Sequence, residues 1–237
     1  MGLKAVLFDF NGVIINDETI HQELITDILL GENLRSDSYD FQRFCLGRSD
    51  RACLRDILKN RGRVVSEDYL NKLINRKTIA YKQKLSQLET LPIYPGLNEF
   101  LNQLQQEQLV VGLVTGALKQ EALFVLEKIS LVQYFSIIVA GDDITSSKPE
   151  PDGYLLAVSK ISQQYPELNL QPNECLVIED TYAGIEAAKR AGMQVVGISH
   201  TYPLHMLQRR ADWTVDYLAD IEIARVNQVL SNQEIVF

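Results

Sequence analysis

Ala5-Val6-Leu7-Phe8-Asp9-Phe10-Asn11-Gly12-Val13 stands near the start of the chain and decides the fold. Its apolar run over residues 5–8 is followed at once by a carboxylate and a glycine, which is typical of a buried strand that ends in a turn. In open parallel α/β sheets, ligands bind outside the carboxyl ends of the strands. We therefore expect Asp9 to lie at a reactive edge of a sheet, although Asp-x-Asn-Gly alone also describes an ordinary turn.

From residue 97 onward, segments with strand and helix patterns alternate. Strands are predicted at 109–114, 136–140, 174–178, 194–198 and 213–215, and helices at 97–108, 118–128, 152–164 and 183–191. Such alternation, with continuously apolar strands, indicates a parallel sheet that is covered by helices on both faces. The predicted fold class is therefore α/β, with a doubly wound, Rossmann-like parallel sheet as the core.

Between the first strand and this alternating region, the sequence has helical periodicity only. Apolar residues recur at helical spacing over 18–30, 41–45, 52–58 and 69–85. The turn cluster at residues 92–96 ends this stretch. We expect residues 17–90 to form an inserted helical cap (lid) on a core domain built from 1–16 and 91–237. The cap would close by hinge motion at residues 15–18 and 90–95.

Composition argues against several classes of partner. The net charge of −8 and the pI of about 5.0 disfavour nucleic acid and anionic membranes, because binding to either needs a basic patch. Because the first predicted strand starts close to the N-terminus, we expect no signal peptide. No apolar run approaches the ~20 residues of a membrane span. We expect a cytoplasmic, monomeric protein without nucleic-acid or membrane partners.

The cysteines give no sign of a structural site. Cys45, Cys53 and Cys175 are scattered and odd in number, and no Cys-x-x-Cys pair or Cys/His cluster accompanies them. A structural zinc site is therefore not expected. Reduced thiols are the simplest interpretation for a protein of the cytoplasm.

Polar residues suited to phosphate chemistry lie in four segments at the predicted strand ends or in a loop. These segments are Asp9-Phe10-Asn11, Val114-Thr115-Gly116, Ser146-Ser147-Lys148-Pro149 and Glu179-Asp180-Thr181. Each has an ordinary alternative, since Asp and Thr are good helix N-caps, a lone lysine is often solvated and a lone threonine often belongs to a turn. Their joint occurrence, in one order along the chain, favours a shared site.

In order and spacing, the four segments resemble motifs of the haloacid dehalogenase superfamily. Within it they resemble the branch of β-phosphoglucomutase and phosphoglycolate phosphatase, which carries D-x-D-G-V/T, then S/T, then K-P, then E-D-S/T-x-x-G-I-x-A-A-x-x-A-G-M. Here the last motif reads EDTYAGIEAAKRAGM over residues 179–193. The resemblance spans residues 4 to about 200. It implies a phosphatase-like hydrolase with a helical cap.

The resemblance also implies the roles of the site residues. A phosphoryl group would pass from a small phosphorylated metabolite to Asp9, which can act as a covalent nucleophile, and then to water. Lys148, the Thr115 hydroxyl and the Gly116 N–H would bind and neutralise the phosphoryl oxygens. The expected cofactor is Mg²⁺, which prefers oxygen ligands. Its ligands would be Asp9, the Asn11 backbone carbonyl, Glu179 and Asp180, with Glu179 either a direct ligand or an outer contact.

Cap residues would determine the substrate specificity. The segment 47–51, Gly-Arg-Ser-Asp-Arg, resembles the family's cap loop that faces the core site, so Arg48 and Arg51 could meet a distal anionic or sugar group. A helix start with Ser49 as the N-cap and two solvated arginines is an equal alternative. A phosphonatase would need a cap lysine as a Schiff base, but we expect the lysines of the predicted helix over 69–85 to be solvated; these are Lys72, Lys77, Lys82 and Lys84.

Asn11 departs from the family pattern, which has an aspartate two residues after the nucleophile. That aspartate is the general acid/base; an amide cannot exchange a proton near neutral pH, and the loss costs about 10²–10⁴ in rate. The protein could be a slow phosphatase for good leaving groups, or could use Asp17, Glu18 or His21 as the proton donor. It could instead be a weakly catalytic ligand-binding or regulatory protein, or Asn11 could be an engineered or deamidated position. A phosphosugar mutase is the remaining alternative activity.

Overall fold

A parallel sheet forms the core of the computed structural model, which describes residues 2–35, 37 and 39–232. Its six strands are all parallel and lie in the order β3-β2-β1-β4-β5-β6. They are β1 (Ala5–Phe8), β2 (Val110–Val114), β3 (Ile137–Val139), β4 (Cys175–Glu179), β5 (Gln194–Ile198) and β6 (Trp213–Val215). The doubly wound α/β fold class is therefore confirmed.

The central strand β1 marks the point where the winding of the sheet reverses. Ala5 lies opposite Val110 of β2 and Cys175 of β4, and Phe8 lies opposite Leu113 and Ile178 in the same register. A crevice at the carboxyl end of such a strand is the usual ligand site of this architecture. The register therefore puts Asp9, the residue after β1, beside the ends of both β2 and β4.

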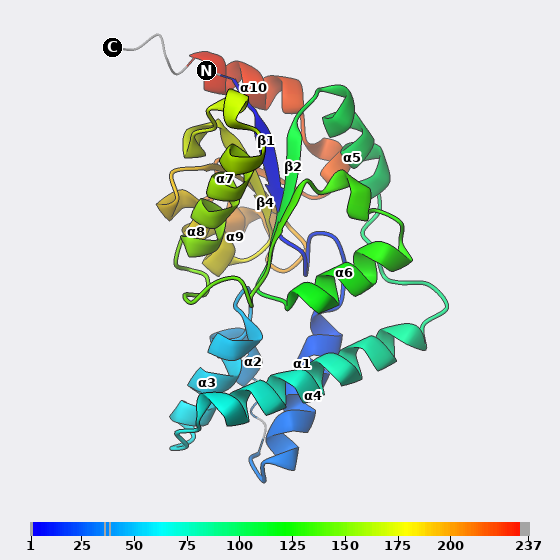
Figure 1. Ribbon diagram of the computed structural model, residues 1–237, viewed down its shortest axis with the longest axis vertical. Coiled ribbons are helices and arrows are strands. Elements are labelled where there is room, and N and C mark those ends of the chain that lie inside the picture. The colour runs from blue at the N-terminus through cyan, green and yellow to red at the C-terminus, as the bar shows by residue number, and fades with distance from the viewer. Residues whose placement is uncertain (1, 36, 38, 233–237) are drawn as a thin grey trace.

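Each face of the sheet buries its own apolar cluster. Along β1, Val6 and Phe8 point into one cluster and Ala5 and Leu7 into the other, as the strand period of two requires. The first face is covered by α5 (Leu97–Gln106), α6 (Lys119–Lys128) and α10 (Ile223–Asn232). The second is covered by α7 (Asp152–Gln164), α8 (Tyr182–Arg190) and α9 (Leu204–Leu207) (Figure 1).

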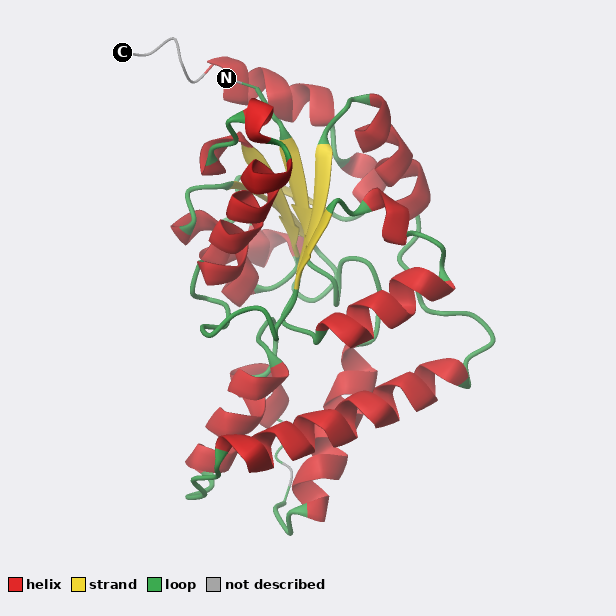
Figure 2. Cartoon of the chain, in the orientation of Figure 1, coloured by secondary structure: helices red, strands yellow, loops and turns green. Residues whose placement is uncertain are grey.

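The regular elements of the inserted cap, among its described residues, are all helices, and the cap lies below the carboxyl edge of the sheet (Figure 2). Its helices are α1 (Glu18–Gly31), α2 (Asp40–Phe44), α3 (Asp50–Asn60) and α4 (Glu67–Ser86). They bury a third apolar cluster of their own, with Ile28, Leu54 and Leu73 among its members. The Ser49 hydroxyl caps α3 by accepting the Ala52 N–H, as the ordinary interpretation of this segment predicts.

A disulfide joins Cys45 and Cys53 inside the cap cluster, with their Cα atoms 4.4 Å apart. The expectation of reduced thiols is therefore wrong for these two residues, which lie at the end of α2 and on α3. Cys175 is a free and buried thiol on β4. The pairing follows from helix packing in the cap, which cysteine spacing alone did not reveal.

The two segments that connect cap and core run side by side. The Asn16 N–H donates to the Pro92 carbonyl at 2.8 Å, and the Tyr94 N–H donates to the Ile14 carbonyl at 3.0 Å. This pairing places the predicted hinge segments against one another. Hinge motion itself stays a prediction.

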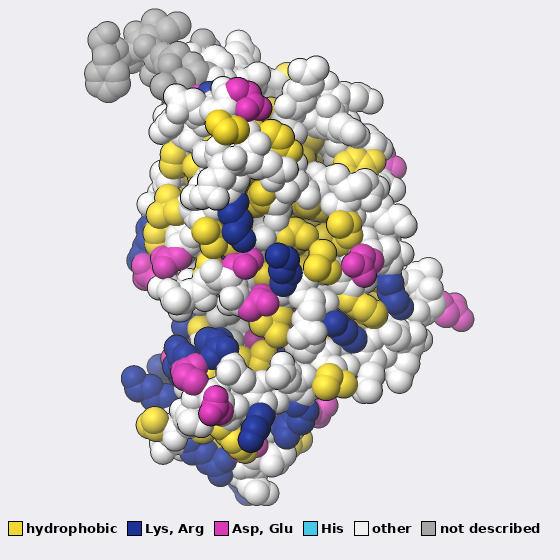
Figure 3. Space-filling model, viewed as in Figure 1, with side chains coloured by type: hydrophobic (Ala, Val, Ile, Leu, Met, Phe, Trp, Pro, Cys, Tyr) yellow, Lys and Arg dark blue, Asp and Glu magenta, His cyan; other side chains and the backbone are white. Residues whose placement is uncertain are grey.

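Charges of both signs are mixed on the face of the molecule shown in Figure 3. On the face shown in Figure 3, Lys and Arg side chains of the cap stand among Asp and Glu side chains. Arg51 and Arg55 pair with Glu67, and Lys84 pairs with Glu23. Within the described residues, no helix has the length and apolar character needed to cross a membrane.

Candidate active site

The loop that follows β1 passes very close to the end of β4. The Asp9 N–H donates to the Ile178 carbonyl at 3.0 Å, which extends the strand pairing to the first polar residue. Gly12 has a φ of +78°, and a Cβ atom there would lie 1.9 Å from the Asp180 carboxylate. Only glycine permits both this conformation and this approach. The glycine therefore lets the loop after β1 pack against Asp180.

Lys148 is buried between two carboxylates. Its Nζ lies 2.7 Å from Asp9 Oδ1 and 2.6 Å from Glu179 Oε1, and it also donates to the Val114 carbonyl at 3.2 Å. Burial opposes the charged form, but the carboxylates of Asp9 and Glu179 outweigh it and hold the pKa of Lys148 well above its usual range. Lys148 is therefore a fixed positive charge beside Asp9.

Glu179 uses both of its oxygens to hold its neighbours. Oε1 accepts from Lys148 and, at 3.2 Å, from the Tyr154 hydroxyl. Oε2 accepts from the Asp180 N–H at 3.0 Å, the Thr181 N–H at 3.1 Å and the Thr181 hydroxyl at 3.0 Å. Thr181 is also the N-cap of α8, so the ordinary capping role and a role in the site coexist.

Asp180 completes a cluster of three carboxylates. Oxygens of Asp9, Glu179 and Asp180 lie within 4.8 Å of one another. Asp180 Oδ2 accepts from the Thr201 hydroxyl, but Oδ1 is buried and has no hydrogen-bond partner among the described residues. Burial, reinforced by Glu179 and Asp9, raises the pKa of Asp180 well above its usual range. Burial also raises the pKa of Asp9 to about 7, against the opposing effect of Lys148.

These properties fit a divalent cation. Carboxylates that repel one another, one of them with an unpartnered buried oxygen, are stabilised when a hard cation binds between them. The donor set consists of oxygens, which suits Mg²⁺. Because both oxygens of Glu179 already accept hydrogen bonds, Asp9 and Asp180 are the side chains best placed to bind it directly.

Thr115 and Gly116 follow β2 at the same edge of the sheet. Thr115 is buried, and its hydroxyl oxygen accepts from the Ala117 N–H at 3.0 Å. A Cβ atom on Gly116 would lie 2.8 Å from the backbone of Arg48, so the cap loop packs directly on this glycine. The Ser49 N–H also donates to the Ser147 hydroxyl of the core at 2.7 Å. The cap loop therefore lies in contact with the core loops beside Asp9.

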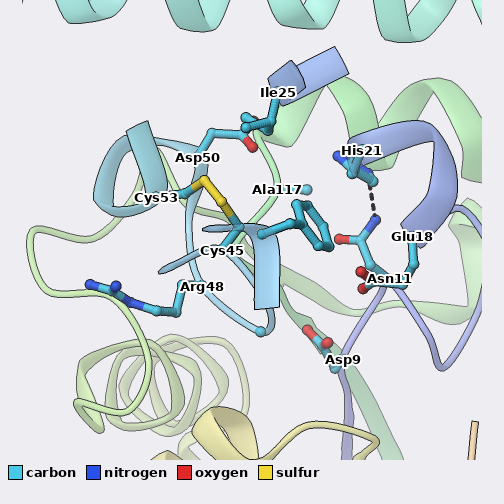
Figure 4. Close-up of a pocket in the computed structure, with 13 residues that line it drawn as sticks. Asp9, Asn11, Glu18, His21, Ile25, Cys45, Arg48, Asp50, Cys53 and Ala117 are labelled. Carbon is cyan, nitrogen blue, oxygen red and sulfur yellow. Dashed lines mark hydrogen bonds between the residues drawn. A yellow bond between two sulfur atoms is a disulfide. The ribbon is translucent and has the colours of Figure 1, made fainter. Parts of the chain in front are cut away.

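The two arginines of this loop do not aim their guanidinium groups at the core. Arg48 lines the cavity, but its guanidinium donates to the Phe44 carbonyl at 3.0 Å and to Asp56 at 2.7 Å. Figure 4 shows Arg48 extending away from the other labelled side chains. Arg51 pairs with Glu67 on the cap and is not among the cavity-lining residues. Their placement does not match the expectation that either arginine meets a distal anion.

Lys77 corrects another expectation, because it is buried rather than solvated. Its Nζ lies 2.7 Å from Asp50 on α3 and 3.4 Å from Glu121 on α6, so the ion pair connects cap and core. Burial opposes its charge, but Asp50 and Glu121 raise the pKa of Lys77. A charged ammonium does not suit Schiff-base chemistry. The other lysines on α4 are exposed or partly exposed, as predicted: Lys72, Lys82 and Lys84.

Asn11 takes part in a network that the sequence did not reveal. Its Nδ2 donates to both oxygens of Asp17 at 3.0 Å and lies 3.0 Å from His21 Nε2 (Figure 4). The Tyr81 hydroxyl, from α4, donates to the same Asp17 carboxylate at 2.5 Å. An aspartate at position 11 would face the Asp17 carboxylate, whereas the amide donates to it. The Asn11 amide is therefore complementary to the Asp17 carboxylate, because it donates where the carboxylate accepts.

Asp17 and His21 form a buried ion pair at the start of α1, with 3.2 Å between Oδ2 and Nε2. Burial opposes charge on both groups. The attraction between the two groups outweighs the effect of burial: His21 lowers the pKa of Asp17, and Asp17 raises the pKa of His21. The ion pair favours ionised Asp17 and protonated His21, so Asp17 has no proton to donate, and loss of a proton from His21 would break the ion pair.

Glu18 differs from these two residues. It lines the same cavity between core and cap as Asp9 and Asn11. Its Oε2 is buried without a hydrogen-bond partner among the described residues. Burial raises the pKa of Glu18 to about 7, against the opposing effect of His21. Among the three alternatives raised by the sequence, Glu18 is the carboxyl group that a substrate could reach.

Comparison with known proteins identifies the family. Residues 6–198 match the family model described as haloacid dehalogenase-like hydrolase. The chain belongs to this family. The match covers the core strands that carry the site together with the inserted cap, so the family resemblance read from the motifs is confirmed.

Relatives of this haloacid dehalogenase-like hydrolase are phosphatases and phosphomutases. It is 30% identical over 205 residues, 86% of this chain and 89% of the relative, to validoxylamine A 7′-phosphate phosphatase of Streptomyces hygroscopicus subsp. limoneus. It is 29% identical over 224 residues, 91% and 94% of the two chains, to β-phosphoglucomutase of Bacillus subtilis. The crystal structure of β-phosphoglucomutase from Clostridium difficile has the same fold, with a TM-score of 0.82 at 23% identity over 99% and 100% of the chains. The protein is therefore a hydrolase with a capped α/β core.

The buried lysine generates a prediction about stability. Lys148→Met should lower the free energy of unfolding by about 3–5 kcal/mol in metal-free buffer, because it leaves two buried carboxylates uncompensated. The loss should be larger at about pH 8 than at about pH 5, since a carboxyl group whose pKa is raised on folding destabilises the native state as the pH rises. Urea denaturation at both pH values measures this.

Lys160 supplies the matched control. Its partly exposed ammonium pairs with Asp143 at 3.4 Å, so Lys160→Met should cost less than about 1 kcal/mol at either pH. Equal losses for the two variants would show that Lys148 is not the charge on which the site depends.

Proposed function

We propose that this hydrolase is a Mg²⁺-dependent phosphatase that forms an aspartyl-phosphate on Asp9. The phosphoryl group would come from a small phosphorylated metabolite and would end on water. The observation that carries the proposal is the buried Lys148, held against Asp9 by Glu179 and next to the unpartnered oxygen of Asp180. A buried carboxylate with one fixed cation beside it, and a second cation site adjacent, is suited to attack on a phosphate dianion.

The cation would be held by Asp9, Asp180 and the Asn11 backbone carbonyl. Bound there, Mg²⁺ supplies positive charge that offsets the repulsion between carboxylate and phosphate. Glu179 positions Lys148 and the start of α8 through the hydrogen bonds on both of its oxygens. The substitution at Asn11 leaves the backbone carbonyl in place, so it does not remove a metal ligand.

The chain's own groups then perform the transfer. The Asp9 carboxylate attacks phosphorus and the ester oxygen leaves, while Lys148, the Thr115 hydroxyl and the Gly116 N–H neutralise the phosphoryl oxygens. The cap loop that packs on Gly116 excludes water from this edge. Hydrolysis of the phospho-aspartate by a water molecule completes the reaction.

Asn11 makes proton transfer the slow part of the reaction. The leaving alkoxide needs a proton, and the attacking water must lose one, but an amide can do neither. The wild-type protein should therefore act slowly on alkyl phosphates and faster on esters with good leaving groups. A phosphosugar mutase depends on the same proton transfers and also needs space for a second phosphate, so it is the weaker alternative. A phosphate-binding or regulatory protein would bind the same ligands without turnover.

The cation site should be detectable through its effect on thermal stability. Mg²⁺ should raise the melting temperature of the wild-type protein, because it binds the native state only. Asp180→Asn should abolish the Mg²⁺-dependent shift, whereas Asp68→Asn, at an exposed position on α4, should retain it. Differential scanning fluorimetry with and without Mg²⁺ makes the comparison. A full shift in Asp180→Asn would mean that the cation binds elsewhere.

A second prediction concerns Asn11. Asn11→Asp should raise turnover of alkyl phosphates by about 10²–10⁴ and that of p-nitrophenyl phosphate much less, because nitrophenolate hardly needs a proton. The new carboxyl would face Asp17, and two adjacent carboxylates tend to share a proton, as a general acid requires. Steady-state kinetics on both ester types measures the gain.

Asn16→Asp is the control for this substitution, since Asn16 is exposed and outside the cavity. It should leave both rates unchanged. An equal gain from Asn11→Asp on both ester types would contradict the role assigned to proton transfer.

A further inference from the structure

Carboxyl side chains stand on the cap side of the cavity. Glu18 and Asp50 line it together with Ile25, Phe41 and the Cys45–Cys53 disulfide. A phosphoryl group at Asp9 would direct the organic part of the substrate toward these side chains, because they line the same cavity. Figure 4 shows Glu18 beside Asn11, and Asp50 and Ile25 farther from Asp9. Their charge therefore bears on which phosphomonoesters fit.

The basic side chains that line this cavity within the described chain are already neutralised. Arg48 binds Asp56 and the Phe44 carbonyl. His21 binds Asp17. Arg48 Nε is buried without a hydrogen-bond partner among the described residues, but Asp56 already balances the charge of the guanidinium. Neither Arg48 nor His21 therefore adds uncompensated positive charge to the cavity.

The two carboxyl groups on the cap side, Glu18 and Asp50, are less completely neutralised than these two basic groups. Asp50 shares Lys77 with Glu121, so one buried ammonium faces two carboxylates. Glu18 has a buried oxygen with no hydrogen-bond partner among the described residues. The cap side of the cavity thus offers carboxyl oxygens between apolar walls, and it gains negative charge as Glu18 ionises near pH 7.

We propose that the site selects small phosphomonoesters whose organic part donates hydrogen bonds and carries no second anion. Glu18 is the residue that determines this specificity, and the inference rests on the phosphatase function proposed above. A carboxylate accepts from a hydroxyl or an ammonium group and repels a carboxylate or a second phosphate. The inference excludes bisphosphates and phosphorylated carboxylic acids as preferred substrates.

Three matched compounds test the inference: 2-hydroxyethyl phosphate, 2-aminoethyl phosphate and 2-phosphoglycolate. They share a two-carbon skeleton and differ only in the group that would face Glu18. Isothermal titration calorimetry on the full chain with Mg²⁺ should show the hydroxyl or ammonium compound binding at least about tenfold more tightly than phosphoglycolate. The ratio between the first two compounds tells whether a hydroxyl or an ammonium is preferred. Binding of phosphoglycolate equal to or tighter than both others would overturn the inference.

Substitutions test whether Glu18 causes the discrimination against phosphoglycolate. Glu18→Gln should reduce the discrimination against phosphoglycolate by about tenfold, because the amide keeps the shape and removes the charge. Glu89→Gln is the matched control at an exposed position outside the cavity and should leave the discrimination unchanged. Asp50→Asn, which frees Lys77 from one partner, should change the discrimination in the same direction as Glu18→Gln. No change in both cavity variants would overturn the assignment.

The failure of this inference is distinguishable from failure of the proposed function. If inorganic phosphate binds and acetyl phosphate labels Asp9 while all three two-carbon esters fail to bind, the specificity is wrong and the phosphatase function stands. If neither inorganic phosphate binding nor labelling of Asp9 is observed, the proposed function itself is overturned.

Discussion

The buried Lys148 between Asp9 and Glu179 is the interaction on which the rest of the active site depends. Transfer of one carboxylate into a protein interior is expensive, and this site buries three of them within 4.8 Å. Lys148 balances part of that charge, and the hydrogen bonds on both oxygens of Glu179 hold the lysine against Asp9. Asp180 lacks such a partner: its Oδ1 accepts no hydrogen bond among the described residues, and the neighbouring carboxylates oppose its ionisation. A bound cation would favour its ionised form. The burial of three carboxylates around one lysine thus accounts for the activation of the nucleophile and for the preference for a metal ion.

Parallel-sheet geometry explains why so much of this site could be predicted from sequence. The carboxyl ends of parallel strands share one edge, so polar residues after β1, β2 and β4 converge there although they are far apart in the chain. Lys148, in a loop, joins them as the motif spacing indicated. The strands and the longer helices up to β6 lie close to their predicted bounds, since continuous apolar runs and helical periodicity are local signals. The short helix α9 and the C-terminal helix α10 were not predicted.

The sequence was sufficient to predict that the cap is helical, but it did not predict which side chains of the cap contact one another. Tyr81 meets Asp17 only because α4 packs on α1, and the Cys45–Cys53 disulfide and the burial of Lys77 likewise follow from packing between helices. Asn11 illustrates the limit most clearly. As a sequence feature it is a departure from a catalytic pattern, whereas in the structure its amide donates to Asp17 across the junction of core and cap. The substitution removes a proton donor and at the same time avoids two facing carboxylates.

The central claim is that Asp9 is a covalent nucleophile, and labelling with acetyl phosphate in the presence of Mg²⁺ tests it most directly. An acyl phosphate needs no protonation of its leaving group, so phosphorylation should proceed with Asn11 in place, and dephosphorylation should be slow without a general base. Intact-protein mass spectrometry should show the added mass of one phosphoryl group, peptide mapping should place it on Asp9, and Asp9→Asn should remain unlabelled. A label on another residue, or no label under conditions in which phosphate binds, would contradict the account.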